Sequence, residues 1–362
     1  MLGLLLPGLS IKCIGQDLMT TRKRQHRWVF RGLYAVYLLV LLIVGYRGFL
    51  WWSYSVPPTD LTNRVDAYQL HYSELFTRGI LQSRRTSGEL NILLLGASVA
   101  EQTGGILESK LTAAAGIPVH VHNAAVSAHT TQDSLNKLEC LIERGAEFDR
   151  IIIYHAINDV RMNCVAAEDF RDDYSHCAWY AAFNRKKRTG VMSVRDTVSE
   201  SLDKLIGLGE PDAAHVAFGD DIKTGPAFQL HMEQMLRIAR DAKTPVTLMT
   251  FATHFVDGYT KEAFDAKQLG YAAGAYELAT EVWGKPENVS RGVAIHNEVI
   301  RQLSSEHPDL IFIDMESELK DIKYFTDVCH LSAAGLDRFA DVVAEQLNVS
   351  LTANHSADFR QE

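Results

Sequence analysis

The chain has 362 residues, 47% hydrophobic and 22% charged, an ordinary composition for a globular protein with room for one large domain and further segments. Its formal net charge is −9, the opposite of the large basic surface by which proteins bind nucleic acids, so no nucleic-acid partner is expected. None of its 5 cysteines stands in a Cys-x-x-Cys or Cys/His pattern typical of zinc sites, so no metal is expected.

The first predicted element is a membrane-spanning helix over residues 32–52, with the sequence GLYAVYLLVLLIVGYRGFLWW. A spanning helix needs about 20 mostly apolar residues. The segment reaches that length with Arg47 near one end, where a long side chain can extend to the headgroups. Basic residues crowd positions 22–31, so the positive-inside tendency predicts a cytoplasmic segment (1–31), a signal-anchor and an extracytoplasmic remainder.

Two other interpretations of this segment remain open. A cleaved signal peptide is disfavoured because the apolar stretch is long and no small-residue cleavage pattern follows it. A buried core helix is disfavoured because a basic flank precedes the stretch and Tyr46, Trp51 and Trp52 end it, as in an interfacial aromatic belt. Met19 is an alternative start to Met1 for such an anchor.

The rest of the chain alternates strand and helix patterns. A linker and a leading helix are expected in residues 53–89, with the helix over 62–84. Short aliphatic runs, typical of strands buried on both faces, then alternate with helical patterns, which predicts a parallel sheet of about five strands between helices. This α/β domain would span residues 90–350, with a tail at 351–362. Strands are expected at 92–95, 119–121, 151–154, 246–249 and 310–313, and helices at 131–144, 227–242, 291–305 and 333–347.

A long insert, about residues 160–224, separates the third and fourth strands and is typical of a lid or a binding surface. Its basic run, residues 185–188, is expected to be a solvated face, with an anionic glycan or lipid headgroup as the alternative contact. Cys164 and Cys177 are close enough in sequence for a disulfide, and two thiols are an equally good expectation.

In parallel sheets the ligand binds at the carboxyl ends of the strands, so the residues just after each strand should carry the chemistry. Ser98 comes directly after the first strand, and Asp327 and His330 lie three residues apart after the last. These residue types build a nucleophile, its base and the group that orients the base. Each alone has a plainer interpretation, for instance Ser98 as a helix N-cap.

These residues resemble the sequence blocks of the SGNH hydrolases, also called GDSL esterases and lipases, over roughly residues 90–347. Four blocks can be placed in order, each after a predicted strand, and that combination is more specific than any single block. The matches are Gly96-Ala97-Ser98, Asn123 to Ala128, Ala156-Ile157-Asn158-Asp159 and Asp327-Val328-Cys329-His330.

The resemblance implies a three-layer, flavodoxin-like sandwich and a division of labour. Ser98 would be the nucleophile, His330 its general base and Asp327 the residue that orients the imidazole. The backbone N–H groups of Ser98 and Ala128, together with the side-chain amide of Asn158, would bind the oxyanion.

The chain departs from the family pattern at residues that shape the loops. Ala97 stands where Asp is usual, and Ala156, with Ala125 or Ala128, stands where Gly is usual. An alanine keeps the backbone N–H, and only a left-handed backbone conformation would make it cost roughly 1–2 kcal/mol. We therefore expect an active but divergent member.

Three functions are compatible with these patterns. The first is a membrane-anchored carboxylic ester hydrolase acting on an acylated glycan or lipid. The second is an O-acyltransferase with the same three residues, and the third is a binding module that keeps the fold without catalysis. A nucleotide binder is a weaker candidate, because no phosphate-binding Gly-rich loop follows the first strand.

Two further residues are expected near the site. Asp159 is expected to form hydrogen bonds beside it, and His254 is expected either to touch the substrate or to support the fold. The mechanism implies no cofactor.

Overall fold

The computed structural model describes residues 31–48, 65–191 and 210–358, with side chains as far as residue 347. Contacts divide the chain into two units, of which one contains the N-terminal segment and the other an α/β body.

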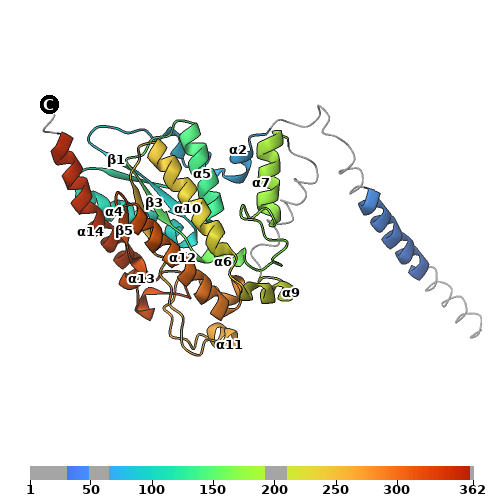
Figure 1. Ribbon diagram of the computed structural model, residues 1–362. Coiled ribbons are helices and arrows are strands. Elements are labelled where there is room, and N and C mark those ends of the chain that lie inside the picture. Colours follow the sequence, from blue (N-terminus) through green and yellow to red (C-terminus); the bar gives the residue numbers. More distant parts are fainter. Residues whose placement is uncertain (1–30, 49–64, 192–209, 359–362) are drawn as a thin grey trace, which may run out of the picture. The chain divides into compact units, whose positions relative to one another are not determined.

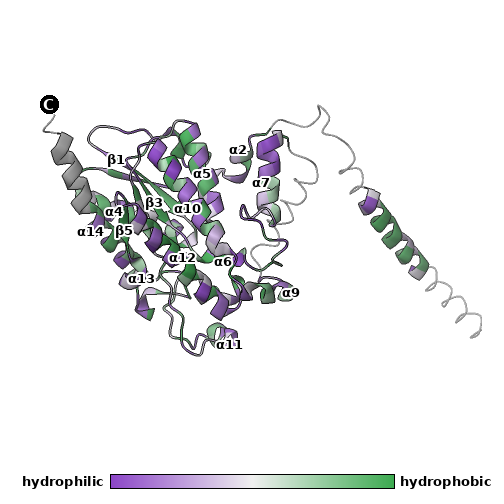
Figure 2. Cartoon of the chain, viewed as in Figure 1, coloured by the Kyte–Doolittle hydropathy of each residue, from purple (hydrophilic) through white to green (hydrophobic). Residues whose placement is uncertain are grey.

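The N-terminal unit contains a helix, Arg31–Gly48, which overlaps the predicted membrane-spanning segment 32–52 over residues 32–48. It is 18 residues long and none of it is buried against protein. Figure 2 shows hydrophobic residues along most of its length, so it is long and apolar enough to cross a membrane. A signal sequence near an N-terminus meets the same criterion, and residues 49–52 of the predicted span lie outside the described residues.

The centre of the body is a sheet of five parallel strands in the order β2-β1-β3-β4-β5, as the alternating pattern predicts. Along β1, Ile92 and Leu94 pack in one hydrophobic core, and Leu93 and Leu95 in a second core on the other face. This two-sided burial explains why the strands are continuous aliphatic runs. The bounds are β1 Leu90–Gly96, β2 Val119–Asn123, β3 Arg150–Tyr154, β4 Val246–Met249 and β5 Ile311–Ile313.

Helices cover both faces of the sheet and so form three layers (Figure 1). α4 (Ser98–Ala115) and α14 (Ala333–Asp358) pack against each other over one face, and α5 (Thr131–Glu143) and α10 (Thr224–Asp241) cover the other, with α12 (Pro286–Glu306) beside α10. The four predicted helices are confirmed. The strand order reverses direction between β1 and β3, and this switch point is where open α/β sheets bind ligands.

The predicted leading helix over 62–84 is wrong as a single element. Its described part forms three short pieces, α2 (Ala67–His71), α3 (Glu74–Thr77) and the 3-10 turn η1 (Ile80–Gln82). Tyr72 leaves helical geometry with φ −125° and ψ 52°, and Gly79 has a left-handed φ of 70°. Both breaks stop the backbone hydrogen-bond ladder that a continuous helix needs.

α6 (Ile157–Arg161) leads into the insert, which contributes α7 (Ala178–Thr189), α9 (Ala213–Val216) and η2 (Ala217–Asp220). Residues 192–209 lie outside the described residues. The basic run ends α7 and is not a uniformly solvated face. Lys187 is exposed and pairs with Glu139, but Lys186 is fully buried with its Nζ 3.1 Å from His71 Nε2. The cysteines of the described residues are thiols, so Cys164 and Cys177 are not bridged. Further short elements are α11 (Lys261–Asp265), η3 (Thr280–Val282), α13 (Met315–Glu318) and η4 (Ile322–Tyr324).

Candidate active site

The turn from β1 into α4 positions Ser98. Gly96 approaches neighbouring backbone so closely that a Cβ there would lie 2.3 Å from the Cβ of Ala100 and 2.8 Å from the carbonyl oxygen of Tyr154. Ala97 is extended, and α4 begins at Ser98, which is 7% exposed. The first N–H groups of a helix have no partner within it, so the Ser98 N–H lies at the positive end of the helix dipole.

A closed loop between η4 and α14 holds Asp327 and His330. The Thr326 N–H donates to the His330 carbonyl oxygen at 2.9 Å and closes the loop. Oδ1 of Asp327 accepts backbone N–H groups from Cys329 at 2.9 Å and His330 at 2.8 Å. Its Oδ2 accepts the N–H of Leu278 at 2.8 Å, so the carboxylate is fixed from two sides.

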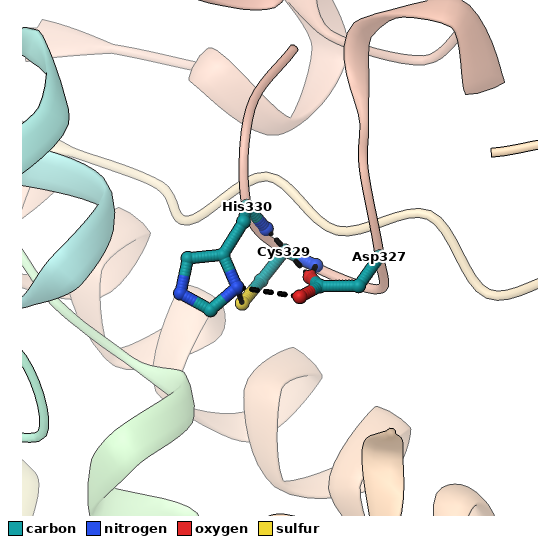
Figure 3. Close-up of side chains that lie close together, drawn as sticks. All are labelled: Asp327, Cys329 and His330. Carbon is teal, nitrogen blue, oxygen red and sulfur yellow. Dashed lines mark hydrogen bonds and ion pairs between the residues drawn. The ribbon is translucent and has the colours of Figure 1, made fainter. Parts of the chain in front are cut away.

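Three side chains form a buried hydrogen-bond chain. Nδ1 of His330 lies 2.6 Å from Oδ2 of Asp327 (Figure 3), and its Nε2 lies 2.8 Å from Oγ of Ser98. An ionised carboxylate only accepts hydrogen bonds, so we assign the ring proton to Nδ1. Nε2 is then a bare acceptor for the Ser98 hydroxyl. The structure therefore brings together the three residues that the sequence patterns single out.

Asn158, at the start of α6, has a defined amide orientation. The Nε1–H of Trp283 donates to its Oδ1 at 2.7 Å. Because an indole N–H is only a donor, this contact identifies the oxygen of the amide. Nδ2 then donates one hydrogen to the carbonyl oxygen of His129 at 3.0 Å and keeps the other.

Ala128 adopts the left-handed conformation, with φ 68°. A side chain in this region costs roughly 1–2 kcal/mol, so alanine at this position carries a penalty that glycine would not. The neighbouring N–H groups are engaged, that of Ser127 with Glu101 and that of His129 with Val126. Across the described residues, the N–H of Ala128 has no such partner.

Asp159 and His254 do not join the hydrogen-bond chain of Ser98. Asp159 is buried and accepts the hydroxyl and N–H of Thr131 and the hydroxyl of Tyr174. Burial raises its pKa to about 7 against the lowering effect of these donors. Nδ1 of His254 lies 2.9 Å from the Lys320 carbonyl oxygen, and its ring stacks on Phe325, so it supports the loop that leads to Asp327.

The sequence patterns miss two aromatic residues at this site. Tyr276 stacks on the His330 imidazole, with ring centroids 5.0 Å apart and an angle of 13° between the planes. Trp283 lies 6.1 Å from the same ring. Both come from the connection between β4 and α12, many residues after the strand end. The rule that residues directly after a strand carry the chemistry therefore cannot find them.

Asp327, Cys329 and His330 also place an oxygen, a sulfur and a nitrogen within 4.8 Å of one another. Metal binding by a cysteine requires its thiolate. Burial raises the pKa of the Cys329 thiol well above its usual range, and His330 Nδ1 already bonds Asp327. This donor set therefore fits the hydrogen-bond chain better than a metal ion.

Among known proteins, no family model matches the chain, and no curated protein matches it either. Several solved structures are similar to the chain in fold. A GDSL-like lipase from Bacteroides thetaiotaomicron has 12% identity and a TM-score of 0.43, covering 77% of this chain and 98% of its own. A lipase/acylhydrolase from Enterococcus faecalis has 18% identity and a TM-score of 0.36, with coverage of 72% and 96%. A catalytic mutant of an acetylxylan esterase from Geobacillus stearothermophilus has 12% identity and a TM-score of 0.41, with coverage of 71% and 94%.

Proposed function

We propose that this chain is a serine hydrolase of the SGNH type that cleaves a carboxylic ester, with Ser98 as nucleophile, His330 as general base and Asp327 as the residue that orients His330. The observation that carries the proposal is the continuous chain Asp327–His330–Ser98, with distances of 2.6 and 2.8 Å. A surface histidine or a simple helix cap would not be buried in such a chain.

In the first step, Oγ of Ser98 attacks the ester carbonyl carbon while Nε2 of His330 takes the hydroxyl proton. The carbonyl oxygen becomes an oxyanion, and its collapse breaks the bond to the alcohol, which leaves with the proton from His330. An acyl-enzyme on Ser98 remains. Water then attacks it with His330 again as base, and the carboxylic acid is released as Ser98 recovers its proton.

The oxyanion would be held by three donors: the N–H groups of Ser98 and Ala128 and the remaining Nδ2 hydrogen of Asn158. Support comes from the helix N-terminus at Ser98, the unengaged N–H of Ala128 and the amide orientation that Trp283 imposes on Asn158. Each preorganised donor contributes about 3–4 kcal/mol of transition-state stabilisation in other enzymes.

The substrate would be an acylated glycan or lipid outside the cytoplasmic membrane. The apolar helix Arg31–Gly48 would be the anchor, and the basic residues before it would keep the N-terminus cytoplasmic. An ester in a surface glycan or lipid would then lie within reach of the body.

The test is hydrolysis of p-nitrophenyl acetate and longer acyl esters at neutral pH. The parent should turn over, and Ser98→Ala and His330→Ala should lose at least about 10³-fold in kcat/KM. Ser305→Ala removes an exposed hydroxyl in α12 and should leave the rate unchanged.

A fluorophosphonate probe should label the parent on Ser98 and leave Ser98→Ala unlabelled. A folded parent that neither hydrolyses any ester nor reacts with the probe would contradict the proposal. Added oligosaccharide or alcohol acceptors would reveal acyl transfer as a competing outcome of the same acyl-enzyme.

A further inference from the structure

A cavity of about 810 Å³ lies along α5 and α10, and none of the residues of the Ser98 site lines it. Six lining residues come from one face of α5 and six from α10, and α7 and residues 171–173 complete the wall. Small-molecule sites in proteins usually measure about 300–1,000 Å³, so the cavity has the size of a binding site.

The lining of this cavity combines carboxamides with aliphatic side chains. Gln132 and Asn136 are buried, 8% and 4% exposed, and Gln132 Nε2 donates to Asn136 Oδ1 at 3.2 Å. Leu135 and Ile238 lie beside them in the lining. Asn136 is engaged at both ends of its amide, because its Nδ2 also donates to the Tyr72 hydroxyl at 3.0 Å. The amide oxygen of Gln132 would therefore accept from a sugar hydroxyl, and the aliphatic side chains would contact the C–H face of the ring.

His231 points to a ligand independently of the amides. Its side chain lines the cavity and is 1% exposed. Nδ1 lies 2.8 Å from the hydroxyl oxygen of Thr131, but the buried Nε2 makes no hydrogen bond, although the Asp172 backbone is near. A buried polar atom without a partner costs about 1–3 kcal/mol, and a ligand could remove that cost.

The ligand chemistry follows from this nitrogen and from the charges of the rim. A ring nitrogen donates or accepts according to its tautomer, and a hydroxyl group can satisfy either state. The rim carries charges of both signs, and some are already engaged: Lys187 pairs with Glu139, and Asp173 accepts from Asn184. Carboxylates outnumber cationic side chains in the lining, which disfavours an anionic ligand.

We propose that this cavity is a carbohydrate-binding site for a neutral oligosaccharide segment, separate from the Ser98 site. The proposal does not require Ser98 to be a nucleophile. The two sites share a buried wall, because the Thr131 hydroxyl contacts both His231 and Asp159, and Asp159 follows Asn158.

The test is calorimetric titration of the full chain carrying Ser98→Ala, in detergent micelles. The probes are neutral tetrasaccharides of glucose, xylose and N-acetylglucosamine, with tetragalacturonate as the anionic comparison. At least one neutral probe should bind, and tetragalacturonate should bind roughly tenfold more weakly or worse.

Two variants locate the binding. Gln234→Trp places a large side chain in the cavity from a half-buried position on α10, and should weaken binding by about tenfold or more. Gln302→Trp is the matched control on the exposed face of α12, outside the cavity lining, and should bind like the parent. Thermal melting checks that both variants fold.

The absence of binding by every neutral probe would overturn the proposal, as would unchanged binding in a folded Gln234→Trp variant. Because the titration uses Ser98→Ala, its outcome does not depend on ester hydrolysis. A failure here and a failure of the esterase assay are therefore separate results.

Discussion

At the scale of single residues, Asp327 is surrounded by donors. Its carboxylate accepts from three backbone N–H groups, those of Leu278, Cys329 and His330, and from the His330 ring. A carboxylate held this firmly fixes the tautomer of His330, because only the form with its proton on Nδ1 completes the contact. Asp327 therefore controls both the position of the His330 ring and its tautomer.

Asp327→Asn should lower kcat/KM for p-nitrophenyl acetate by about 10³–10⁴-fold, since an amide favours the wrong tautomer of His330. Labelling by a fluorophosphonate should fall in parallel. The melting temperature should also fall, because the amide NH2 must face a backbone N–H that the carboxylate accepts. Asp309→Asn, at an exposed position before β5, is the control and should keep parental activity. A variant of Asp327 that kept a tenth of the parental rate or more would contradict this role.

Ala128→Gly should stabilise the fold by roughly 1 kcal/mol. Glycine removes the left-handed strain at this position, and this gain exceeds the stability lost because glycine gives the unfolded chain more conformational entropy. Urea unfolding measures the free energy. Ala113→Gly, at an exposed site in α4, should have the opposite sign at about 0.5–1 kcal/mol. Equal destabilisation in both variants would show that residue 128 carries no strain.

How far the sequence predicts the site depends on where each residue lies. Ser98, Asp327 and His330 follow strand ends or a recognisable block, and the structure brings all three together. Tyr276 and Trp283 come from an irregular connection without periodicity, so no pattern marks them. The three oxyanion donors, namely the N–H groups of Ser98 and Ala128 and the amide of Asn158, stay a prediction from the sequence and the proposed mechanism.

At the scale of elements, buried strands were predictable and marginal helices were not. The short aliphatic runs predict buried strands, since a sheet covered on both faces buries every residue of its central strands. The region of 62–84 contains apolar residues at helical spacing, but Gly79 and Tyr72 break the ladder, and tertiary contacts decide where the short pieces end. Helical periodicity alone carries no information about such breaks.

Gly96→Ala should destabilise the turn between β1 and α4 by about 3 kcal/mol, because the new methyl group meets Ala100 and the Tyr154 backbone, both on packed elements. Loss of esterase activity should accompany it. Gly105→Ala is the matched control, since an added Cβ there meets nothing within 4 Å, and a helical alanine should stabilise by about 0.5–1 kcal/mol. Denaturant unfolding distinguishes the two, and a neutral Gly96→Ala would contradict the close approach.

At the scale of the whole molecule, buried histidines set the pH dependence of stability. Burial lowers the pKa of six histidines among the described residues, four of them strongly. The unfolded chain therefore binds more protons, and stability falls as pH drops from about 6.5 towards 4. Asp159 acts in the opposite direction. Its pKa is raised to about 7, so its contribution to the stability of the fold is lost as pH rises through that value. The four are His129, His231 and His296, each with a pKa of about 4, and His155, with a pKa of about 3.

We therefore expect the melting temperature to fall between pH 7 and pH 5, with each histidine contributing up to about 1.4 kcal/mol per pH unit. Calorimetry of the body at several pH values measures it. A melting temperature that is constant or rises towards pH 5 would mean that Asp159 outweighs the histidines.

The N-terminal helix gives a prediction at the same scale. The full chain should sediment with membranes and resist carbonate extraction, whereas a chain beginning at Ser53 should be soluble without detergent. Its activity on p-nitrophenyl acetate should match the full chain within about twofold, because none of the helix is buried against protein. Recovery of the full chain in the soluble fraction would contradict the anchor.

Ser98 and His330 lie 232 residues apart in the chain, yet their side chains are in contact. During synthesis, Ser98 is therefore made long before His330, the residue that would activate its hydroxyl. The interval includes every remaining strand, and α14, which packs on α4, emerges last. On the proposed mechanism, a newly made molecule would therefore stay inactive until His330 has been synthesised and α14 has packed on α4.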